Sequence, residues 1–320
     1  MMRRLFCLLL LGLLLLPASS LRAASRPVIA DYRPVWLPVT PVQGGKTLVA
    51  IRSFRRNSVP SYLLVDPGTL ATRVAPAAGF VAGGSHARQL LSETPYIRTL
   101  DRSTAPPWPI QNQGVTHAPE PVDGWILSVD LCPSHRPFEQ AFFQTLMARA
   151  GAPGRPVPVA ISITGTWLKT HPAELAWLKE QSAARRLAIT WVNHSEHHPY
   201  TPGVPLEKNF VLTPGTDFRS EVLTLEERLL AEDLLPSPFF RFPGLVSNET
   251  VVRQLKEMGL IPLGSDAWLA KGERPKSGSI ILIHGNGNEP PGIRKMLELL
   301  RSPTLPPFLS LPTVVSGRPG

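Results

Sequence analysis

The sequence predicts an α/β fold in which parallel strands alternate with helices, as either a barrel or an open sheet. Two observations carry this prediction. After Pro121, short apolar runs typical of strands alternate with segments of helical periodicity. Before Pro121, the chain is rich in proline and turn residues, which indicates a small β-rich extension. We therefore expect a signal peptide (1–24), a β-rich extension with a linker (25–119) and an α/β domain (120–320).

The first 24 residues have the pattern of a secretory signal peptide. Two arginines precede an apolar run from Leu5 to Leu16, and small residues follow up to Ala24. The run is too short to span a bilayer comfortably, and no later stretch is long and apolar enough. We therefore expect an exported protein, periplasmic or secreted, without a stable transmembrane span. Export leaves Cys132 as the lone cysteine, which cannot form an intramolecular disulfide.

The charge pattern weakly favours acidic surfaces or glycans as partners. The formal net charge is +9, and it includes arginines of the signal segment. The remaining arginines are scattered between prolines and apolar residues, without the basic and aromatic interleaving of nucleic-acid binders. Nucleic acid is therefore excluded as a partner, and nothing in the pattern indicates an oligomeric state.

In the extension, strands are predicted at 47–51 and 61–65, followed by an Asp66-Pro67-Gly68 turn. The proline-rich stretch 103–121 reads as a connecting linker. A helix is expected from Pro137 because Phe138, Phe142 and Leu146 share one helical face. A capping box predicts a second helix start at Thr224. The full set is strands at 125–129, 157–163, 187–192, 239–241, 260–263 and 279–283, and helices at 137–149, 172–185, 224–235, 249–258 and 291–301.

Polar residues close most of the predicted strands. They are Asp130, His194, Arg241, Asp266 and His284. In β/α barrels the C-terminal ends of the strands converge on one face, which is where catalytic groups lie. Helix caps account for isolated aspartates, but less readily for two histidines and an arginine. We therefore expect these five side chains to share one site.

The stretch HSEHHP places His194 and His198 four residues apart just after a strand. If the chain becomes helical near Asn193, both imidazoles lie on one face of a helical turn and can bind one metal ion. The alternative is a polar loop with exposed histidines. Glu196 and His197, inside the same stretch, are expected to face solvent.

From Gly124 onward the chain resembles the polysaccharide deacetylases, the NodB-homology domain of carbohydrate esterase family four. The resemblance rests on five stretches, SVDLCPS, HSEHHP, RFPG, SDAW and ILIH, of which SDAW is the loosest match. It implies a distorted (β/α) barrel. It also implies a metal-dependent hydrolase that acts on carbon–nitrogen bonds other than peptide bonds, removing acetyl groups from an N-acetylated, or O-acetylated, polysaccharide or oligosaccharide.

The resemblance also implies a role for each site residue. Asp130 is the expected catalytic base, Arg241 orients that base, and His284 is the general acid, steadied by Asp266. His194 and His198 are the expected ligands of a divalent metal, with zinc as the preferred ion. The expected substrate contacts are Trp268, as a groove wall, and Pro243 with Gly244.

The first motif departs from the family at Leu131, where members supply the third metal ligand from an aspartate. Either Cys132 coordinates as a thiolate, which suits zinc, or Asp130 itself ligates the metal. The plainer alternative makes Cys132 a small buried hydrophobe. For the whole protein, the alternative to a deacetylase is a catalytically degenerate glycan-binding protein. A thiol hydrolase using Cys132 is a third hypothesis.

Overall fold

We analysed a computed structural model that describes residues 26–84, 89 and 91–317. The expected signal peptide lies outside these residues. Within the described ranges, no helix has the length and apolar character needed to cross a membrane.

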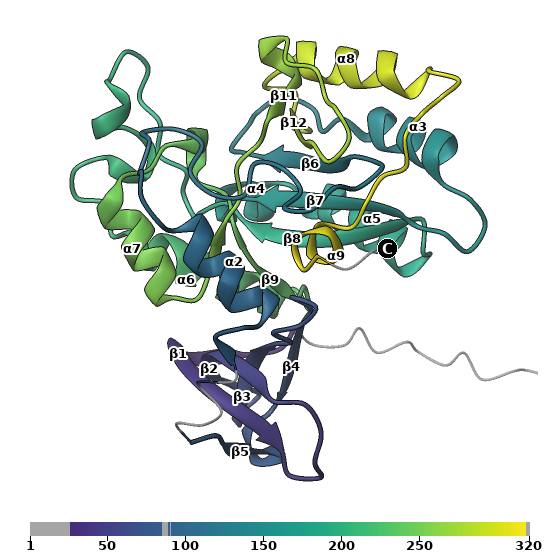
Figure 1. Cartoon of the computed structure of the whole chain (residues 1–320). Coiled ribbons are helices and arrows are strands. Elements are labelled where there is room, and N and C mark those ends of the chain that lie inside the picture. The colour runs from purple at the N-terminus through teal and green to yellow at the C-terminus, as the bar shows by residue number, and fades with distance from the viewer. Residues whose placement is uncertain (1–25, 85–88, 90, 318–320) are drawn as a thin grey trace, which may run out of the picture.

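A curled parallel sheet forms the centre of the molecule (Figure 1). In the described part of the chain it has seven strands in the order β10-β9-β8-β7-β6-β12-β11, and every pairing is parallel. This half-barrel flanked by helices confirms the predicted distorted (β/α) barrel. The strands are β6 (Ile126–Leu131), β7 (Val157–Ile163), β8 (Leu187–Asn193), β9 (Pro236–Phe240), β10 (Ile261–Pro262), β11 (Ala267–Trp268) and β12 (Ile280–His284).

Helices follow the strands along the chain and cover the outer side of the sheet. They are α3 (Gln140–Ala150), α4 (Gly165–Thr170), α5 (Pro172–Ala183), α6 (Phe218–Ala231), α7 (Glu249–Glu257) and α8 (Pro290–Leu300). Two others, α2 (Pro95–Ser103) and α9 (Leu311–Val315), lie outside this alternation. In Figure 1, α3 and α8 lie beside β6 and β12, whereas α6 and α7 lie toward the β9 end of the sheet.

Two helix starts differ from the sequence prediction. Helix α3 begins at Gln140 rather than at Pro137, although Phe142 and Leu146 are buried as expected. Helix α6 begins at Phe218, and Asp217 caps it by accepting a hydrogen bond from the Ser220 amide. The predicted start at Thr224 is therefore wrong. The helix is capped earlier in the sequence, at Asp217, and Thr224 lies inside it.

Alternate residues of the central strands pack on opposite faces of the sheet. On β6, Leu127, Val129 and Leu131 join the apolar cluster beneath α3, α5 and α8. Ile126 packs on the opposite face, in a second cluster. Side chains that point to the barrel interior near the C-terminal strand ends are polar, and they make up the site described below.

The proline-rich stretch before the barrel packs along the opening of the curled sheet. Val115 bridges to Leu263 beside β10, and His117 bridges to Ser279 beside β12. The Val115 amide donates to the Pro262 carbonyl, and the Ala118 amide donates to the Gly278 carbonyl. This stretch therefore spans the gap between the two edges of the half-barrel.

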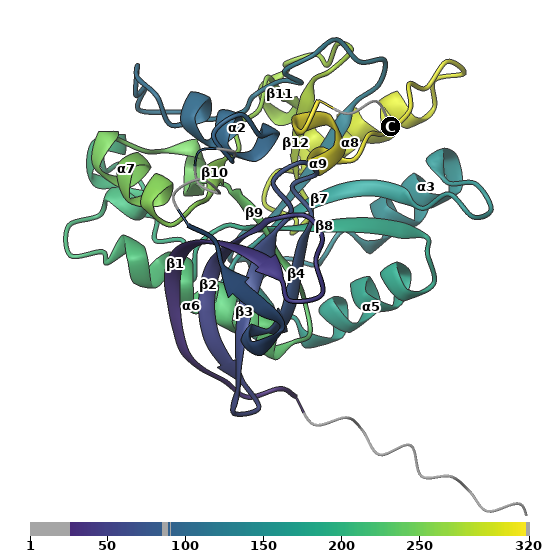
Figure 2. The ribbon, with the colours of Figure 1, turned by 60° about the horizontal axis from the view of Figure 1, so that its bottom comes forward.

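The N-terminal region is an antiparallel sheet that packs beside α6 and β9 (Figures 1 and 2). In the described residues its strand order is β4-β3-β2-β1-β5. The strands are β1 (Ile29–Pro41), β2 (Leu48–Arg56), β3 (Val59–Val65), β4 (Thr72–Pro76) and β5 (Phe80–Ala82). Apolar side chains of β2 and β3 share one cluster with β9, β10 and α7, so this sheet and the barrel have a common core.

Candidate functional site

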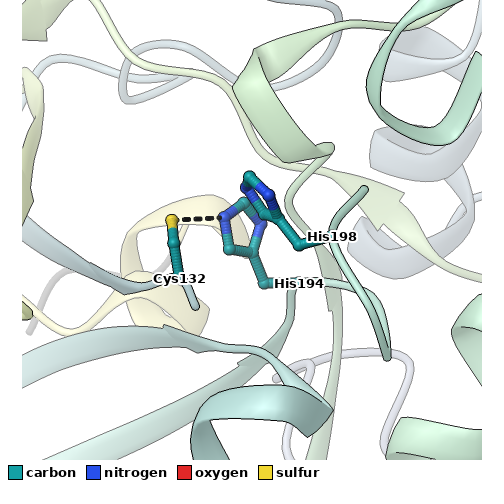
Figure 3. A group of neighbouring side chains, drawn as sticks. All are labelled: Cys132, His194 and His198. Carbon is teal, nitrogen blue, oxygen red and sulfur yellow. Dashed lines mark hydrogen bonds between the residues drawn. The ribbon is translucent and has the colours of Figure 1, made fainter. Parts of the chain in front are cut away.

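Three potential metal ligands meet at the C-terminal ends of β6 and β8 (Figure 3). They are Cys132, His194 and His198, and their ligand atoms all lie within 4.8 Å of one another. The Cys132 Sγ lies 3.4 Å from His194 Nε2, and the imidazoles of His194 and His198 meet edge to face at 4.9 Å between ring centroids. The structure thus brings both predicted histidines together and adds a sulfur.

The orientation of His194 is fixed by the neighbouring strand. Its Nδ1 lies 2.8 Å from the Arg241 carbonyl oxygen, which can only accept a hydrogen bond. Nδ1 therefore carries a proton, and Nε2 faces Cys132 Sγ. A backbone carbonyl on the far nitrogen is the usual support of a metal-ligating histidine.

The turn that carries the two histidines is not helical, contrary to our expectation. Residues 194–200 contain no helix, and both Ser195 (φ 70°) and His198 (φ 52°) adopt the left-handed conformation. Asn193 Oδ1 accepts from the Ser195 amide, and Ser195 Oγ accepts from the His198 amide. Side-chain hydrogen bonds, not helical periodicity, therefore bring His194 and His198 together.

Glu196 was expected to face solvent, but it is 1% exposed. Its carboxylate pairs with Arg228 Nε at 2.8 Å and Lys169 Nζ at 3.0 Å. The next residue, His197, is exposed as expected and pairs with Glu221 at 2.6 Å. Glu196 thus anchors the turn against α4 and α6, and His197 lies outside the ligand cluster.

Strand parity explains why residue 132, not residue 131, supplies the third ligand. Successive side chains of a strand point to opposite faces, so Asp130 and Cys132 share the interior face. Leu131 is fully buried on the other face, in the cluster that contains Val129 and Phe143. An acidic side chain at residue 131 would therefore point into the core.

A Leu131→Asp variant is accordingly expected to lose stability rather than to gain metal affinity. Removing the leucine and burying an unpaired carboxylate costs at least about 3 kcal/mol. The free energy of unfolding in urea measures this loss, and Leu131→Met, which keeps the volume, is the control at less than about 1.5 kcal/mol. A stable Leu131→Asp protein with tighter zinc binding would contradict this placement.

The predicted base and its arginine lie side by side in the interior. Asp130 Oδ1 lies 3.7 Å from Arg241 Nε, and Asp130 Oδ2 lies 3.7 Å from His194 Nε2. Arg241 is fully buried, and its Nη2 donates to Ser128 Oγ and to the Gly264 carbonyl. Within the described residues, Asp130 Oδ1, Arg241 Nε and Arg241 Nη1 have no hydrogen-bond partner. Such orphaned buried atoms are typical of a site that awaits a ligand.

His284 ends β12 beside Asp130, its register partner on β6, as the sequence predicted, but its carboxylate partner is Glu289. His284 Nδ1 lies 2.9 Å from Glu289 Oε2, an ion-pair contact without hydrogen-bond alignment. The expected partner, Asp266, instead pairs with His117 Nδ1 at 2.7 Å and accepts from the Ile280 amide. Asp266 therefore anchors the stretch that closes the barrel and does not contact His284.

Trp268 lies beside His284, with 6.2 Å between ring centroids. Its indole nitrogen donates to Glu289 Oε2 at 2.8 Å, and Lys271 Nζ lies 3.7 Å from the ring centroid. The indole thus holds Glu289 in place beside the acid candidate, while a lysine covers its ring.

Pro243 and Gly244 lie in the short helix η4 (Pro243–Leu245), directly after β9. Gly244 has a φ of 61°, and a Cβ there would lie 2.5 Å from the Phe210 ring. The glycine thus permits close packing of Phe210, which in turn lies edge to face against His198 at 5.7 Å. Its visible role is to make room for this aromatic ring.

We expect Gly244→Ala to destabilise the protein by about 1–3 kcal/mol, because the methyl group meets the Phe210 ring in a strained backbone. Gly215→Ala is the matched control: its φ is also positive, at 86°, but nothing lies within 4 Å of the added Cβ. Thermal unfolding of the two variants separates the clash from the backbone strain. Equal losses would mean that the contact with Phe210 is unimportant.

The buried charges of the site shift one another's pKa values. Burial alone would raise the pKa of the Cys132 thiol. The imidazoles of His198, His284 and His194 together outweigh burial, and the pKa falls well below its ordinary value. Burial lowers the pKa of His284, but Cys132 and Glu289 outweigh it and raise this pKa well above its ordinary value. The site therefore favours a thiolate surrounded by proton donors.

The residues fit a zinc ion. One thiolate and two imidazoles are common zinc ligands, and a set of three leaves a fourth position open for water or substrate. Asp130 lies beside these ligands, with its Oδ2 3.7 Å from His194 Nε2. Of the two alternatives for a third ligand, the geometry favours Cys132, because its sulfur completes the cluster with both histidines.

Sequence reasoning missed Glu289 and Phe210 altogether. Glu289 is the N-cap of α8 and follows a strand-end histidine by five residues, which was a usable signal. Phe210 begins the one-turn helix η3 (Phe210–Leu212) at a φ of 52°, and no sequence periodicity marks it.

The chain is similar in part to known proteins. The family described as the RP012 protein N-terminal domain matches residues 30–96. Among solved structures, a family 4 carbohydrate esterase from Bacillus anthracis is 20% identical, with a TM-score of 0.46, over 70% of this chain and 92% of the other. A chitin deacetylase from Colletotrichum lindemuthianum is 13% identical, with a TM-score of 0.43, over 64% and 92%. A CE4 family pseudoenzyme from Bacillus anthracis is 13% identical, with a TM-score of 0.41, over 62% and 66%.

Proposed function

We propose that this protein is an exported, zinc-dependent hydrolase that removes acetyl groups from an acetylated polysaccharide. The observation that carries the proposal is the meeting of Asp130, Cys132, His194, His198 and His284 at the C-terminal ends of β6, β8 and β12. The substrate class comes from the resemblance of the motifs to those of polysaccharide deacetylases.

The ligand set for the metal is Cys132, His194 and His198. The ion would supply Lewis acidity toward the acetyl carbonyl and would lower the pKa of water. Asp130 is the general base that takes the proton from the attacking water, and the guanidinium of Arg241, with its Nε 3.7 Å from Asp130 Oδ1, orients this carboxylate. As the bond to acetyl breaks, His284 donates a proton to the leaving amine or hydroxyl, and acetate is released.

Glu289 is a positioning residue in this scheme. It receives the indole N–H of Trp268 and faces His284 Nδ1, so it fixes the ring of the general acid.

Metal content and acetate release test the proposal together. Purified mature protein should hold about one zinc per chain and release acetate from acetylated oligosaccharides. A chelator should stop the reaction, and zinc should restore it. A protein with neither zinc nor acetate release would not be a deacetylase of this kind.

A second candidate is a thiol hydrolase, because Cys132 Sγ lies 3.4 Å from His194 Nε2. A Cys132→Asp variant distinguishes the two. A carboxylate can replace the thiolate as a zinc ligand, so a metal enzyme keeps part of its activity. A nucleophilic cysteine has no such substitute, and its enzyme would also resist the chelator.

The third candidate, a degenerate protein that binds glycan without turnover, was suggested by Leu131. Since Leu131 faces the core and Cys132 faces the histidines, that departure no longer removes the third ligand. Wild-type acetate release that disappears in His194→Ala would exclude this candidate.

A further inference from the structure

An aromatic stack runs from the candidate metal site to the surface. The Phe210 ring meets His198 edge to face at 5.7 Å, and Tyr200 stacks on Phe210 at 5.1 Å with 23° between the ring planes. Tyr200 remains 59% exposed although Phe210 covers one of its faces. The other face of a large apolar ring is thus open to solvent beside the site.

Hydrogen bonds of Asn209 hold the segments that carry the two stacked rings. The side chain of Asn209, which is 1% exposed, accepts hydrogen bonds from the amides of Thr201 and Phe210. Its Nδ2 donates to the carbonyls of Thr201 and Val204. Phe210 keeps its left-handed conformation because these bonds and the space at Gly244 support it. A surface that is ordered in advance loses little entropy when it binds a ligand.

Trp268, the aromatic side chain expected from the sequence to line the groove, is less available than Tyr200. Lys271 lies over its ring, and Glu289 takes its N–H. Tyr200 therefore offers the more open aromatic face, separated from His198 only by the Phe210 ring.

We propose that the open face of Tyr200 is a subsite that stacks on a pyranose ring of the glycan, next to the sugar whose acetyl group lies at the metal. The assignment rests on the proposed function. A pyranose has an apolar face of C–H groups, which matches an uncharged aromatic ring backed by a second ring. Tyr200 stacks on Phe210, which contacts His198, and this position suits a sugar that neighbours the reacting one.

A comparison of two substrates tests this subsite. In Tyr200→Ala, the ratio of KM for an N-acetylated glucosamine tetrasaccharide to KM for 4-nitrophenyl acetate should rise about three- to tenfold, as expected for one lost aromatic stack. Tyr200→Phe, which keeps the ring, should recover the lost binding. Tyr62→Ala removes the same ring from β3 of the N-terminal sheet and is the matched control.

An unchanged ratio in Tyr200→Ala would overturn the subsite. If the wild-type protein binds the tetrasaccharide without releasing acetate, the proposed function fails, and the calorimetric Kd then replaces KM with the same expected three- to tenfold change. A wild-type protein that does not bind the tetrasaccharide at all would also overturn the subsite.

Discussion

Replacing His194 with alanine is expected to remove the metal and to abolish acetate release. Its Nε2 is the shared neighbour of Cys132 Sγ and Asp130 Oδ2, and its side chain is 2% exposed. Loss of a residue that hydrogen-bonds to a metal ligand costs about 10- to 100-fold in metal affinity, and loss of the ligand itself should cost more. Zinc analysis and acetate release on the purified variant measure both effects.

His197→Ala is the matched control for this experiment. It removes an imidazole from the same six-residue stretch, but His197 is exposed and pairs with Glu221 outside the ligand cluster. The control should keep its zinc and its rate. Stoichiometric zinc in His194→Ala would contradict the proposed ligand set.

Glu226→Gln should destabilise the protein by about 3–5 kcal/mol, the usual cost of breaking a buried ion pair. Both carboxylate oxygens of Glu226, on α6, accept from Arg52 on β2, at 2.6 and 2.9 Å, and both side chains are fully buried. Tyr32 also donates to this carboxylate. The neutral amide would leave the Arg52 charge uncompensated between the N-terminal sheet and the barrel. Urea unfolding measures the loss.

Asp233→Asn serves as the control, because Arg56 and Asp233 form an ion pair between the same two regions at the surface. An exposed pair is worth no more than about 1 kcal/mol. Asparagine also tolerates the positive φ of residue 233. Similar losses of unfolding free energy in the two variants would mean that burial does not increase the contribution of the Arg52–Glu226 pair to stability.

Much of the barrel was predictable because its strands are buried apolar runs separated by amphipathic helices. Strand β7 was predicted to the residue, and helix α7 begins at Glu249 as predicted. The start of α6 was missed because two capping signals compete, at Asp217 and Thr224, and propensity alone does not choose between them. From its sequence, the stretch 103–121 resembles a linker. Its packing could not be predicted, because its contacts with Leu263 and Ser279 join parts of the chain that are distant in sequence.

The site was predictable where side chains follow strand ends. Asp130, His194, Arg241 and His284 all lie there, because the C-terminal ends of parallel strands meet. Asp266 also ends such a segment, but its contact with His117 depends on how the preceding stretch packs. Strand parity alone could have favoured Cys132 over Leu131, since residues 130 and 132 share a face.

X-ray absorption at the zinc edge of the purified protein tests the central claim most directly. Coordination by Cys132, His194 and His198 predicts one sulfur at about 2.3 Å and nitrogen neighbours at about 2.0–2.1 Å. In Cys132→Asp, the sulfur shell should disappear while the nitrogen shell remains. A wild-type spectrum with only nitrogen and oxygen neighbours, or a purified protein without zinc, would contradict the proposed metal site.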